Sequence, residues 1–187
     1  MPELVTDVRS SGSLSRNPPQ PMITSTRIAR RVRQLGRNIS HVYQDIDTPL
    51  VIVVILKGAT IFAADLLRSL SIPAELEFVR ASSYGSGTSR GALKLANMVD
   101  GPLAGRHLLL VEDIVDSGHT VQGVVRRIRR LKPASLRIAA LLDRPARRDV
   151  EVKIDFLGFT IPDRFVIGYG LDYAGLYREL PGIYALS

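Results

Sequence analysis

Apolar, strand-like runs alternate with amphipathic, helix-like segments along most of the chain. Residues 50–56 (LVIVVIL) are wholly apolar and mostly β-branched, which indicates a strand covered on both faces. Residues 23–44 and 60–70 carry apolar side chains at helical spacing. Further strand-like runs occupy 75–82, 92–98, 135–142, 152–156 and 164–168. This alternation predicts an α/β fold in which helices flank a central, mainly parallel sheet, with a smaller accessory region formed by the two ends of the chain.

The most polar junction in this pattern lies between an apolar run and an amphipathic helix. Residues 107–111 (HLLLV) predict a strand buried on both faces, and the apolar positions from 121 to 131 predict a helix. The stretch 112–120 (EDIVDSGHT) joins them. We therefore expect this stretch at the carboxyl end of a strand, which is the edge where open α/β sheets bind ligands.

The residue types in this stretch suit a phosphorylated sugar. Glu112 and Asp113 are acceptors that can bind neighbouring hydroxyls or hold a hard cation such as Mg²⁺. A phosphate fits the turn that follows, because the first N–H groups of a helix lack partners and hydroxyl groups add donors. Asp116 is a carboxylate beside this phosphate site, which makes it the candidate general base. The turn consists of Asp116, Ser117, Gly118, His119 and Thr120.

The same residues also allow a purely structural interpretation. Asp116 and Ser117 would then cap the helix, and the acidic pair would be a solvated strand end. Each feature alone favours this interpretation, since helix caps are common. Their combination with a buried strand and an amphipathic helix favours a ligand site.

The stretch 111–120 (VEDIVDSGHT) resembles the signature of type I phosphoribosyltransferases, which bind 5-phosphoribosyl 1-pyrophosphate (PRPP). Within that family the chain is most similar to the hypoxanthine-guanine branch, from about residue 23 to its C-terminus. The resemblance implies the type I phosphoribosyltransferase fold, with a small hood built from the N- and C-terminal segments. It also implies Mg²⁺-dependent transfer of the phosphoribosyl group to N9 of hypoxanthine or guanine, giving IMP or GMP and pyrophosphate.

The resemblance assigns roles to the PRPP-binding residues. Glu112 and Asp113 would hold the ribose, and residues 116–120 would hold the 5-phosphate. Asp116 would accept the N7 proton of the base. The pyrophosphate would be bound by Lys57, Gly58 and Arg178. A lid over 82–91 would contribute Ser83 and Tyr84. Without the resemblance, Lys57 would be interpreted as a surface lysine after a core strand, and 82–91 simply as a flexible loop.

The base pocket is expected in the C-terminal third. By resemblance, Phe165 stacks on the purine, the Val166 backbone reads the edge of the base, and Asp172 lies near the base and the metal. The implied metal ligands are Glu112, Asp113 and Asp172. The chain departs from the family at Arg144, where a lysine typically donates to the 6-oxo group. Arginine also donates to a carbonyl, but it is bulkier and forked. Compositional drift and a changed base preference are both open explanations, and Phe165 and Val166 also fit an ordinary strand core.

Length and composition narrow the class of protein. The 187 residues suffice for one full-sized core, and 45% hydrophobic with 23% charged residues is ordinary for a globular domain. The chain has no cysteine, which excludes disulfides and thiolate metal sites and fits a reducing compartment. No apolar run approaches the roughly 20 residues of a membrane span. We expect a cytoplasmic protein without membrane contact, with a loose tail over 1–21 and a single domain over 22–187.

The net charge of +7 raises the question of nucleic acid binding. The basic residues are spread along the sequence, 21 of the 25 are arginine, and only 6% of residues are aromatic. The run 126–130 (RRIRR) is best explained as the solvated face of a helix. We therefore expect PRPP and a 6-oxopurine as partners and do not expect nucleic acid; the family implies a homodimer or homotetramer. The alternatives are a PRPP-sensing regulatory protein that binds nucleic acid, or the same chemistry on xanthine or a pyrimidine.

Overall fold

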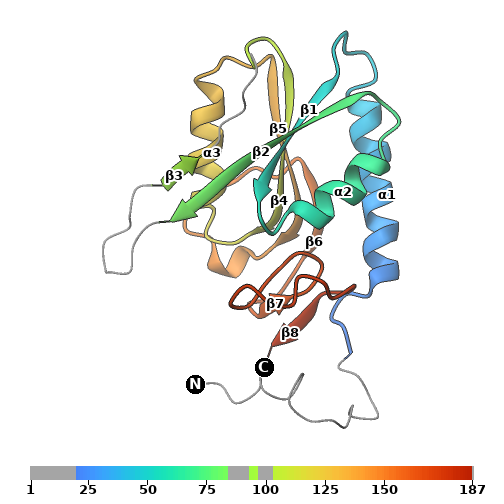
Figure 1. The fold of residues 1–187 in the computed structure, drawn as a ribbon, viewed down its shortest axis with the longest axis vertical. Helices are drawn as coiled ribbons and strands as arrows, with labels where there is room; N and C mark the ends of the chain where they lie inside the picture. The colour runs from blue at the N-terminus through green and yellow to red at the C-terminus, as the bar shows by residue number, and fades with distance from the viewer. Residues whose placement is uncertain (1–19, 84–92, 97–102, 187) are drawn as a thin grey trace.

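A six-stranded sheet forms the centre of this computed structural model, which describes residues 20–83, 93–96 and 103–186 (Figure 1). The strand order is β3-β2-β1-β4-β5-β6, and all strands are parallel except the edge strand β3. The strands are β1 (Leu50–Leu56), β2 (Ala74–Ser83), β3 (Leu93–Ala96), β4 (His107–Val115), β5 (Ser135–Asp143) and β6 (Phe156–Thr160). The predicted class, a mainly parallel α/β sheet flanked by helices, is confirmed.

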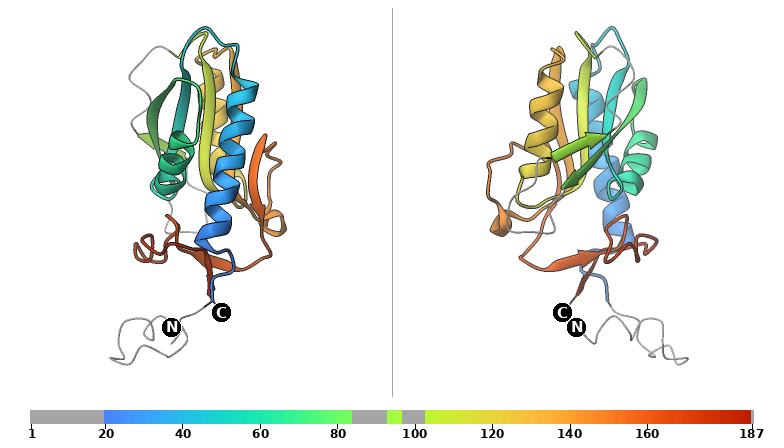
Figure 2. Two further views of the ribbon diagram at one scale, coloured as in Figure 1. Left: turned by 90° about the vertical axis from the view of Figure 1, so that its right-hand side faces the viewer. Right: turned by 60° about the vertical axis from the view of Figure 1, so that its left-hand side comes forward.

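Helices cover both faces of this sheet (Figure 2). One core lies between the sheet and the pair α1 (Ser25–Val42) and α2 (Thr60–Arg68), and a second core lies beneath α3 (His119–Arg129). Alternate residues of β1 enter the two cores, so the strand has no solvent-facing side. This double burial explains why residues 50–56 are apolar without interruption.

The helices begin and end close to the positions expected from the sequence. Thr24 caps α1, and its hydroxyl oxygen accepts a hydrogen bond from the Arg27 backbone N–H at 3.3 Å. The apolar stripe of α1 is buried against the sheet, whereas its opposite face is polar. No helix in the described ranges is long and apolar enough to cross a membrane.

The centre of the sheet contains the point where the direction of winding reverses. From β1 the chain passes through α2 to β2 on one side, and from β4 it passes through α3 to β5 on the other. β1 pairs with β4 only as far as Val54 and Val111, whereas β4 continues alongside β5 to Val115. Beyond Val111, β4 is therefore no longer paired with β1, and this divergence marks the switch point at which open α/β sheets bind ligands.

The hood predicted from the two chain ends is present. It contains a two-stranded antiparallel sheet of β7 (Phe165–Ile167) and β8 (Tyr184–Leu186). The N-terminal segment joins it through Ile23, which exchanges backbone hydrogen bonds with Ile183 at 3.1 and 2.9 Å. The hood lies at the end of the sheet toward which β1 points (Figure 1).

Two strand predictions were wrong in their bounds. The strand predicted at 107–111 extends to Val115, so the acidic pair lies within β4 and not after it. The strand predicted at 152–156 begins only at Phe156. Before that point, Asp155 alone bonds to β5, exchanging hydrogen bonds with the Ile138 backbone at 2.9 Å. The short helix η2 (Pro145–Arg147) and β8 were not predicted. Residues 1–19 of the predicted tail lie outside the described residues.

Candidate active site

The turn after β1 lies directly against the acidic pair of β4. The peptide bond between Leu56 and Lys57 is cis, and Lys57 is exposed. A Cβ atom on Gly58 would lie 1.7 Å from Oδ2 of Asp113, so only glycine fits here while the carboxylate keeps its place. Predicted PRPP-binding residues from two separate strands are thus brought together at the switch point.

Burial shapes the electrostatics of the acidic pair. Glu112 is only 8% exposed, and its Oε2 atom has no hydrogen-bond partner among the described residues. Burial raises the pKa of Glu112 well above its ordinary value, and the charge of Asp113 adds to the effect. Burial also raises the pKa of Asp113, while the positive charge of Arg178 acts in the opposite direction. An unpaired buried acceptor is costly, so this pair is suited to a hydroxyl donor or a cation.

The phosphate-binding turn predicted at 116–120 leads into α3 with backbone donors that have no protein acceptor in the described part of the chain. Gly118 is the N-cap residue of α3, it has a φ of 90°, and no side chain caps the helix. Within the described ranges, the backbone N–H groups of Ser117 to Thr120 have no backbone acceptor. Asp116 and Ser117 therefore do not serve as helix caps, contrary to the structural interpretation. The helix N-terminus presents free donors, as anion sites do.

The segment after η2 supports this turn from behind. The backbone N–H groups of Asp149 and Val150 donate to the carbonyl oxygen of Ser117 at 3.0 and 3.1 Å. His119 is exposed, and its Nε2 lies 3.2 Å from Oδ2 of Asp149. A Cβ on Gly118 would lie 2.6 Å from the carbonyl oxygen of Val150. The turn is therefore held by tight packing as well as by hydrogen bonds.

Arg144 holds the carboxylate of Asp116, the candidate general base. Its Nε and Nη2 donate to Oδ1 and Oδ2 of Asp116 at 3.0 and 2.5 Å, and its Nη1 donates to the carbonyl oxygen of Arg164 at 2.7 Å. Arg144 is 8% exposed, whereas the Asp116 side chain is 40% exposed. The carboxylate is thus oriented by a nearly buried arginine while remaining accessible. Each of its oxygens can accept one further hydrogen bond.

A second arginine, which the sequence analysis missed, holds the backbone of the same residue. Arg148 donates from Nε to the carbonyl oxygen of Asp116 at 2.8 Å and from Nη2 to that of Val115 at 3.1 Å. Its Nη2 also pairs with Asp143, and both side chains are less than a fifth exposed. Asp143, the last residue of β5, is the one acidic partner of Arg148 that a strand-end pattern could have indicated.

We expect Arg148→Met to raise the KM for PRPP and lower kcat, with a combined loss of about tenfold or more. The substitution leaves the Asp116 carbonyl without its charged donor at the start of the phosphate turn, and such hydrogen bonds are worth about 1.5–3 kcal/mol. Steady-state kinetics with varied PRPP measure the effect. Arg147→Met is the matched control, because the Arg147 side chain is 59% exposed and pairs with Asp163. Equal kinetics for the two variants would exclude this positioning role.

The C-terminal third of the chain contributes the remaining predicted site residues. Phe165 is 48% exposed and meets Tyr173 edge-to-face at 5.7 Å between ring centroids, whereas Val166 is buried. The strand-core interpretation therefore holds for Val166 but not for Phe165. Arg178 pairs with Asp172 at 2.5 Å and donates to the carbonyl oxygen of Gly170, also at 2.5 Å.

Two predicted features are not assembled in the described structure. Ser83 ends β2 opposite Leu93, its side chain is not described, and Tyr84 lies outside the described residues. Among the described residues, no group of three or more acidic, histidine or cysteine side chains forms a metal cluster. Glu112, Asp113 and Asp172 thus do not converge as a ready-made metal cage.

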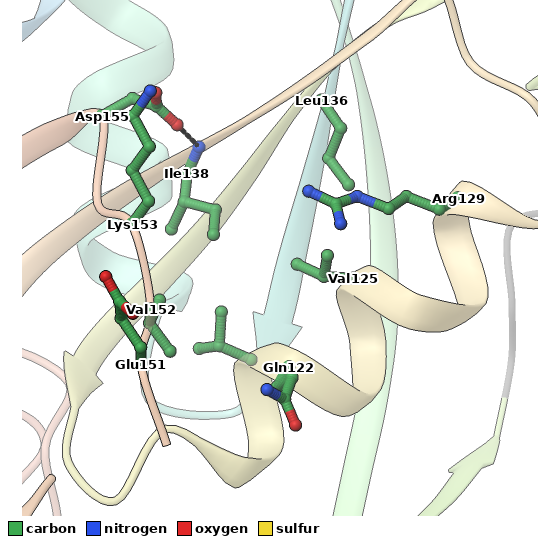
Figure 3. Close-up of a pocket in the computed structure, with 10 residues that line it drawn as sticks. Gln122, Val125, Arg129, Leu136, Ile138, Glu151, Val152, Lys153 and Asp155 are labelled. Atoms are coloured by element: carbon green, nitrogen blue, oxygen red, sulfur yellow. Dashed lines mark hydrogen bonds between the residues drawn. The ribbon is translucent and has the colours of Figure 1, made fainter.

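A separate pocket lies on the α3 side of the sheet, as Figure 3 shows. Its floor is apolar, with Val125, Leu136 and Ile138 from α3 and β5, and none of the predicted site residues lines it. The segment 151–155 forms its other wall. The chemistry-bearing residues gather at the switch point and not in this pocket.

The fold and the switch-point site define a phosphoribosyltransferase, and comparison with known proteins agrees. A model of the phosphoribosyl transferase domain matches residues 24–174, and the chain belongs to this family. It is 45% identical over 161 residues to the hypoxanthine phosphoribosyltransferase of Salmonella typhimurium, which covers 86% of this chain and 90% of that protein. It is 44% identical over 167 residues to the hypoxanthine-guanine phosphoribosyltransferase of Bacillus subtilis, with coverage of 89% and 92%.

Solved structures show the same similarity. A lysine-to-arginine mutant of the Trypanosoma cruzi hypoxanthine phosphoribosyltransferase, in a ternary complex with substrates, superposes with a TM-score of 0.84 at 36% identity, covering 89% of this chain and 94% of that one. The hypoxanthine phosphoribosyltransferase of Staphylococcus aureus gives 0.84 at 34% identity, with coverage of 90% and 91%. The resemblance to type I phosphoribosyltransferases is thereby confirmed.

Proposed function

We propose that this protein is a purine salvage enzyme that transfers the 5-phosphoribosyl group of PRPP to N9 of hypoxanthine or guanine. The products are IMP or GMP and pyrophosphate. The observation that carries the proposal is the position of Asp116, which lies at the start of the turn before α3 and is bound by Arg144. Arg144 also donates to the carbonyl oxygen of Arg164, the residue directly before Phe165. The family membership and the names of the relatives support the same reaction.

The site residues divide into three groups in this proposal. Glu112 and Asp113 bind the ribose hydroxyls, which satisfies the unpaired Oε2 of Glu112. The turn 116–120 binds the 5-phosphate through its free N–H groups. Lys57, Gly58 and Arg178 bind the pyrophosphate, together with Ser83 and Tyr84 from the predicted lid.

In the reaction, N9 of the base forms a bond to C1′ of the ribose as the bond from C1′ to the pyrophosphate oxygen breaks. The base loses its N7 proton to Asp116, whose carboxylate is accessible and already oriented. Lys57 and Arg178 stabilise the negative charge that grows on the departing pyrophosphate. Phe165 provides the exposed aromatic face on which the purine stacks.

Mg²⁺ is the proposed cofactor, and the acidic pair fits it. Mg²⁺ is usually bound by one or two protein carboxylates plus substrate oxygens and water, so the absence of a three-residue cluster from the described residues is compatible with its chemistry. Glu112 and Asp113 would hold the ion together with PRPP, with Asp172 nearby. Bound Mg²⁺ would neutralise charge on the pyrophosphate.

Arg144 is proposed to select 6-oxopurines. Its guanidinium carries five N–H donors, and three hydrogen bonds to Asp116 and Arg164 leave two for the base carbonyl. We expect Arg144→Met to lower kcat/KM for hypoxanthine by about 10–100-fold, the value of one or two hydrogen bonds from a charged donor. Arg144→Lys should retain most of the preference over adenine, since it keeps a charged donor. Kinetics with hypoxanthine and adenine test both variants, and unchanged discrimination in Arg144→Met would exclude the role.

The reaction itself is tested by turnover with PRPP and Mg²⁺ on hypoxanthine, guanine, xanthine, adenine and uracil. We expect product with hypoxanthine or guanine. Turnover only with xanthine or uracil would establish the alternative substrates. A lack of turnover on every base would overturn the enzymatic assignment and favour the PRPP-sensing alternative.

We also propose a cytoplasmic location and a homodimer or homotetramer, on the basis of the family resemblance. One of the similar solved structures concerns the role of the C-terminal region in the oligomeric state and enzymatic activity of the T. cruzi enzyme. Light scattering on the purified chain would measure its oligomeric state.

A further inference from the structure

The outer face of α1 is unusually basic. The helix contains no aspartate or glutamate. It contains five arginines, which are Arg27, Arg30, Arg31, Arg33 and Arg37. All except Arg31 are exposed. The basic run at 126–130 lies elsewhere, at the C-terminal end of α3, so the arginines of α1 form a separate basic surface.

An aromatic side chain lies beside these arginines. A groove between α1 and the edge strand β6 is lined by Arg27, Arg30, Arg31, Gln34, Arg37 and Phe159. The guanidinium carbon of Arg27 lies 5.8 Å from the centroid of the Phe159 ring. Arg31 fixes one wall, because it donates to the carbonyl oxygens of Leu157 and Gly158 at 2.6 and 2.9 Å.

The remaining arginines of this face are available for a ligand. In the described part of the chain, no acidic side chain pairs with Arg30, Arg33 or Arg37. Asp65, the acid that lines the neighbouring groove between α1 and α2, is already bound to Arg68 and to the Tyr169 hydroxyl. The face therefore carries uncompensated positive charge.

We infer that this face of α1, with Phe159, binds single-stranded nucleic acid. Arg30, Arg33 and Arg37 recur at helical spacing, where neighbouring side chains are roughly 5–6 Å apart, so they present a row of cations to a repeating anion. Arginine contacts to phosphates with a nearby aromatic platform for a base are the usual features of single-strand binding. The inference is independent of the proposed transfer reaction, since no residue of the face belongs to that site.

Other occupants fit this surface less well. A membrane-surface helix inserts an apolar face, but the apolar face of α1 is buried in the core of this protein. A second copy of the chain would bring a net charge of +7 toward a basic face. A single small anion would need only one or two of the arginines.

The experiment measures binding of a labelled single-stranded RNA of about 20 nucleotides to the full chain by fluorescence anisotropy, over a series of salt concentrations. We expect the triple variant Arg30→Gln, Arg33→Gln, Arg37→Gln to bind at least about tenfold more weakly. The slope of log K against log salt should fall by about 2, since each neutralised phosphate on a single strand contributes about 0.7. The matched control is Arg126→Gln, Arg129→Gln, Arg130→Gln, which removes the same charge from exposed positions at the C-terminal end of α3 and its C-cap. It should bind within about twofold of the parent.

A second variant tests the aromatic platform. Phe159→Leu should weaken binding about fivefold or more while leaving the salt slope unchanged, because stacking contributes no counterion release. Phosphoribosyl transfer should be unchanged in all three variants, which also shows that they fold. No binding by the parent, or equal losses in the two triple variants, would overturn the inference. Equal binding to duplex or to anionic lipid vesicles would also overturn it, whereas a single-stranded DNA of the same sequence distinguishes DNA from RNA as the source.

Discussion

Asp116→Asn is expected to lower kcat by about 10²-fold or more while leaving PRPP binding nearly unchanged. The amide keeps the shape of the carboxylate and can still accept a hydrogen bond from Arg144, but it cannot take the N7 proton of the base. A hundredfold loss corresponds to about 2.7 kcal/mol of transition-state stabilisation. Single-turnover rates and equilibrium binding of PRPP separate the chemical step from binding.

The control for this variant is Asp163→Asn. Asp163 also pairs with an arginine, Arg147 at 2.7 Å, but this pair is exposed and outside the proposed site. The control variant should retain near-normal turnover, since exposed ion pairs contribute little. If Asp116→Asn also turns over normally, Asp116 is not the base.

Gly58→Ala is expected to cause the other large effect, a loss of roughly 10²-fold or more in kcat/KM for PRPP. The added methyl group would overlap Oδ2 of Asp113, so either this carboxylate, the proposed ribose ligand, or the turn after β1 must move. A displacement of about 1 Å at a reacting site costs on the order of 10²-fold. The KM for PRPP and the chemical denaturation midpoint measure the effects on the site and on stability.

Gly105→Ala provides the comparison for Gly58→Ala. Gly105 has a φ of 74° and open space around its Cα, so alanine there would strain the backbone without touching the site. We expect about 1 kcal/mol of destabilisation and unchanged kinetics. A folded Gly58→Ala protein with a normal KM for PRPP would show that the close contact with Asp113 has no role in binding.

The sequence predicted the fold well wherever burial dictates the pattern. β1 has the predicted bounds, Leu50–Leu56, because both of its faces are covered and every side chain must be apolar. The strand predicted at 152–156 was wrong in its bounds, because the burial pattern there does not dictate how the backbone pairs. Residues 151–154 alternate between exposed and partly buried positions, yet within 151–155 only Asp155 bonds to β5. Alternation indicates which side chains face inward and does not reveal whether the backbone joins the sheet.

The sequence predicted which residues belong to the candidate site better than it predicted the contacts between them. The motif at 111–120 identified Asp116, but the hold of Arg144 on its carboxylate depends on how β4 and β5 end side by side. Arg148 was missed because it acts on backbone carbonyls, which have no signature in the sequence. The accessible Phe165 and the unpaired Oε2 of Glu112 likewise depend on packing between distant segments.

The contact between Gly58 and Gly170 joins the two turns that contain the proposed pyrophosphate-binding residues. A Cβ on Gly170 would lie 2.2 Å from the carbonyl oxygen of Gly58, so the turn that carries Arg178 rests directly on the turn that carries Lys57. The two turns are far apart in the sequence, and such long loops close at an entropic cost that local contacts do not repay. The proposed pyrophosphate site is therefore complete only when these two distant turns are packed against each other, so it depends on the tertiary structure of both.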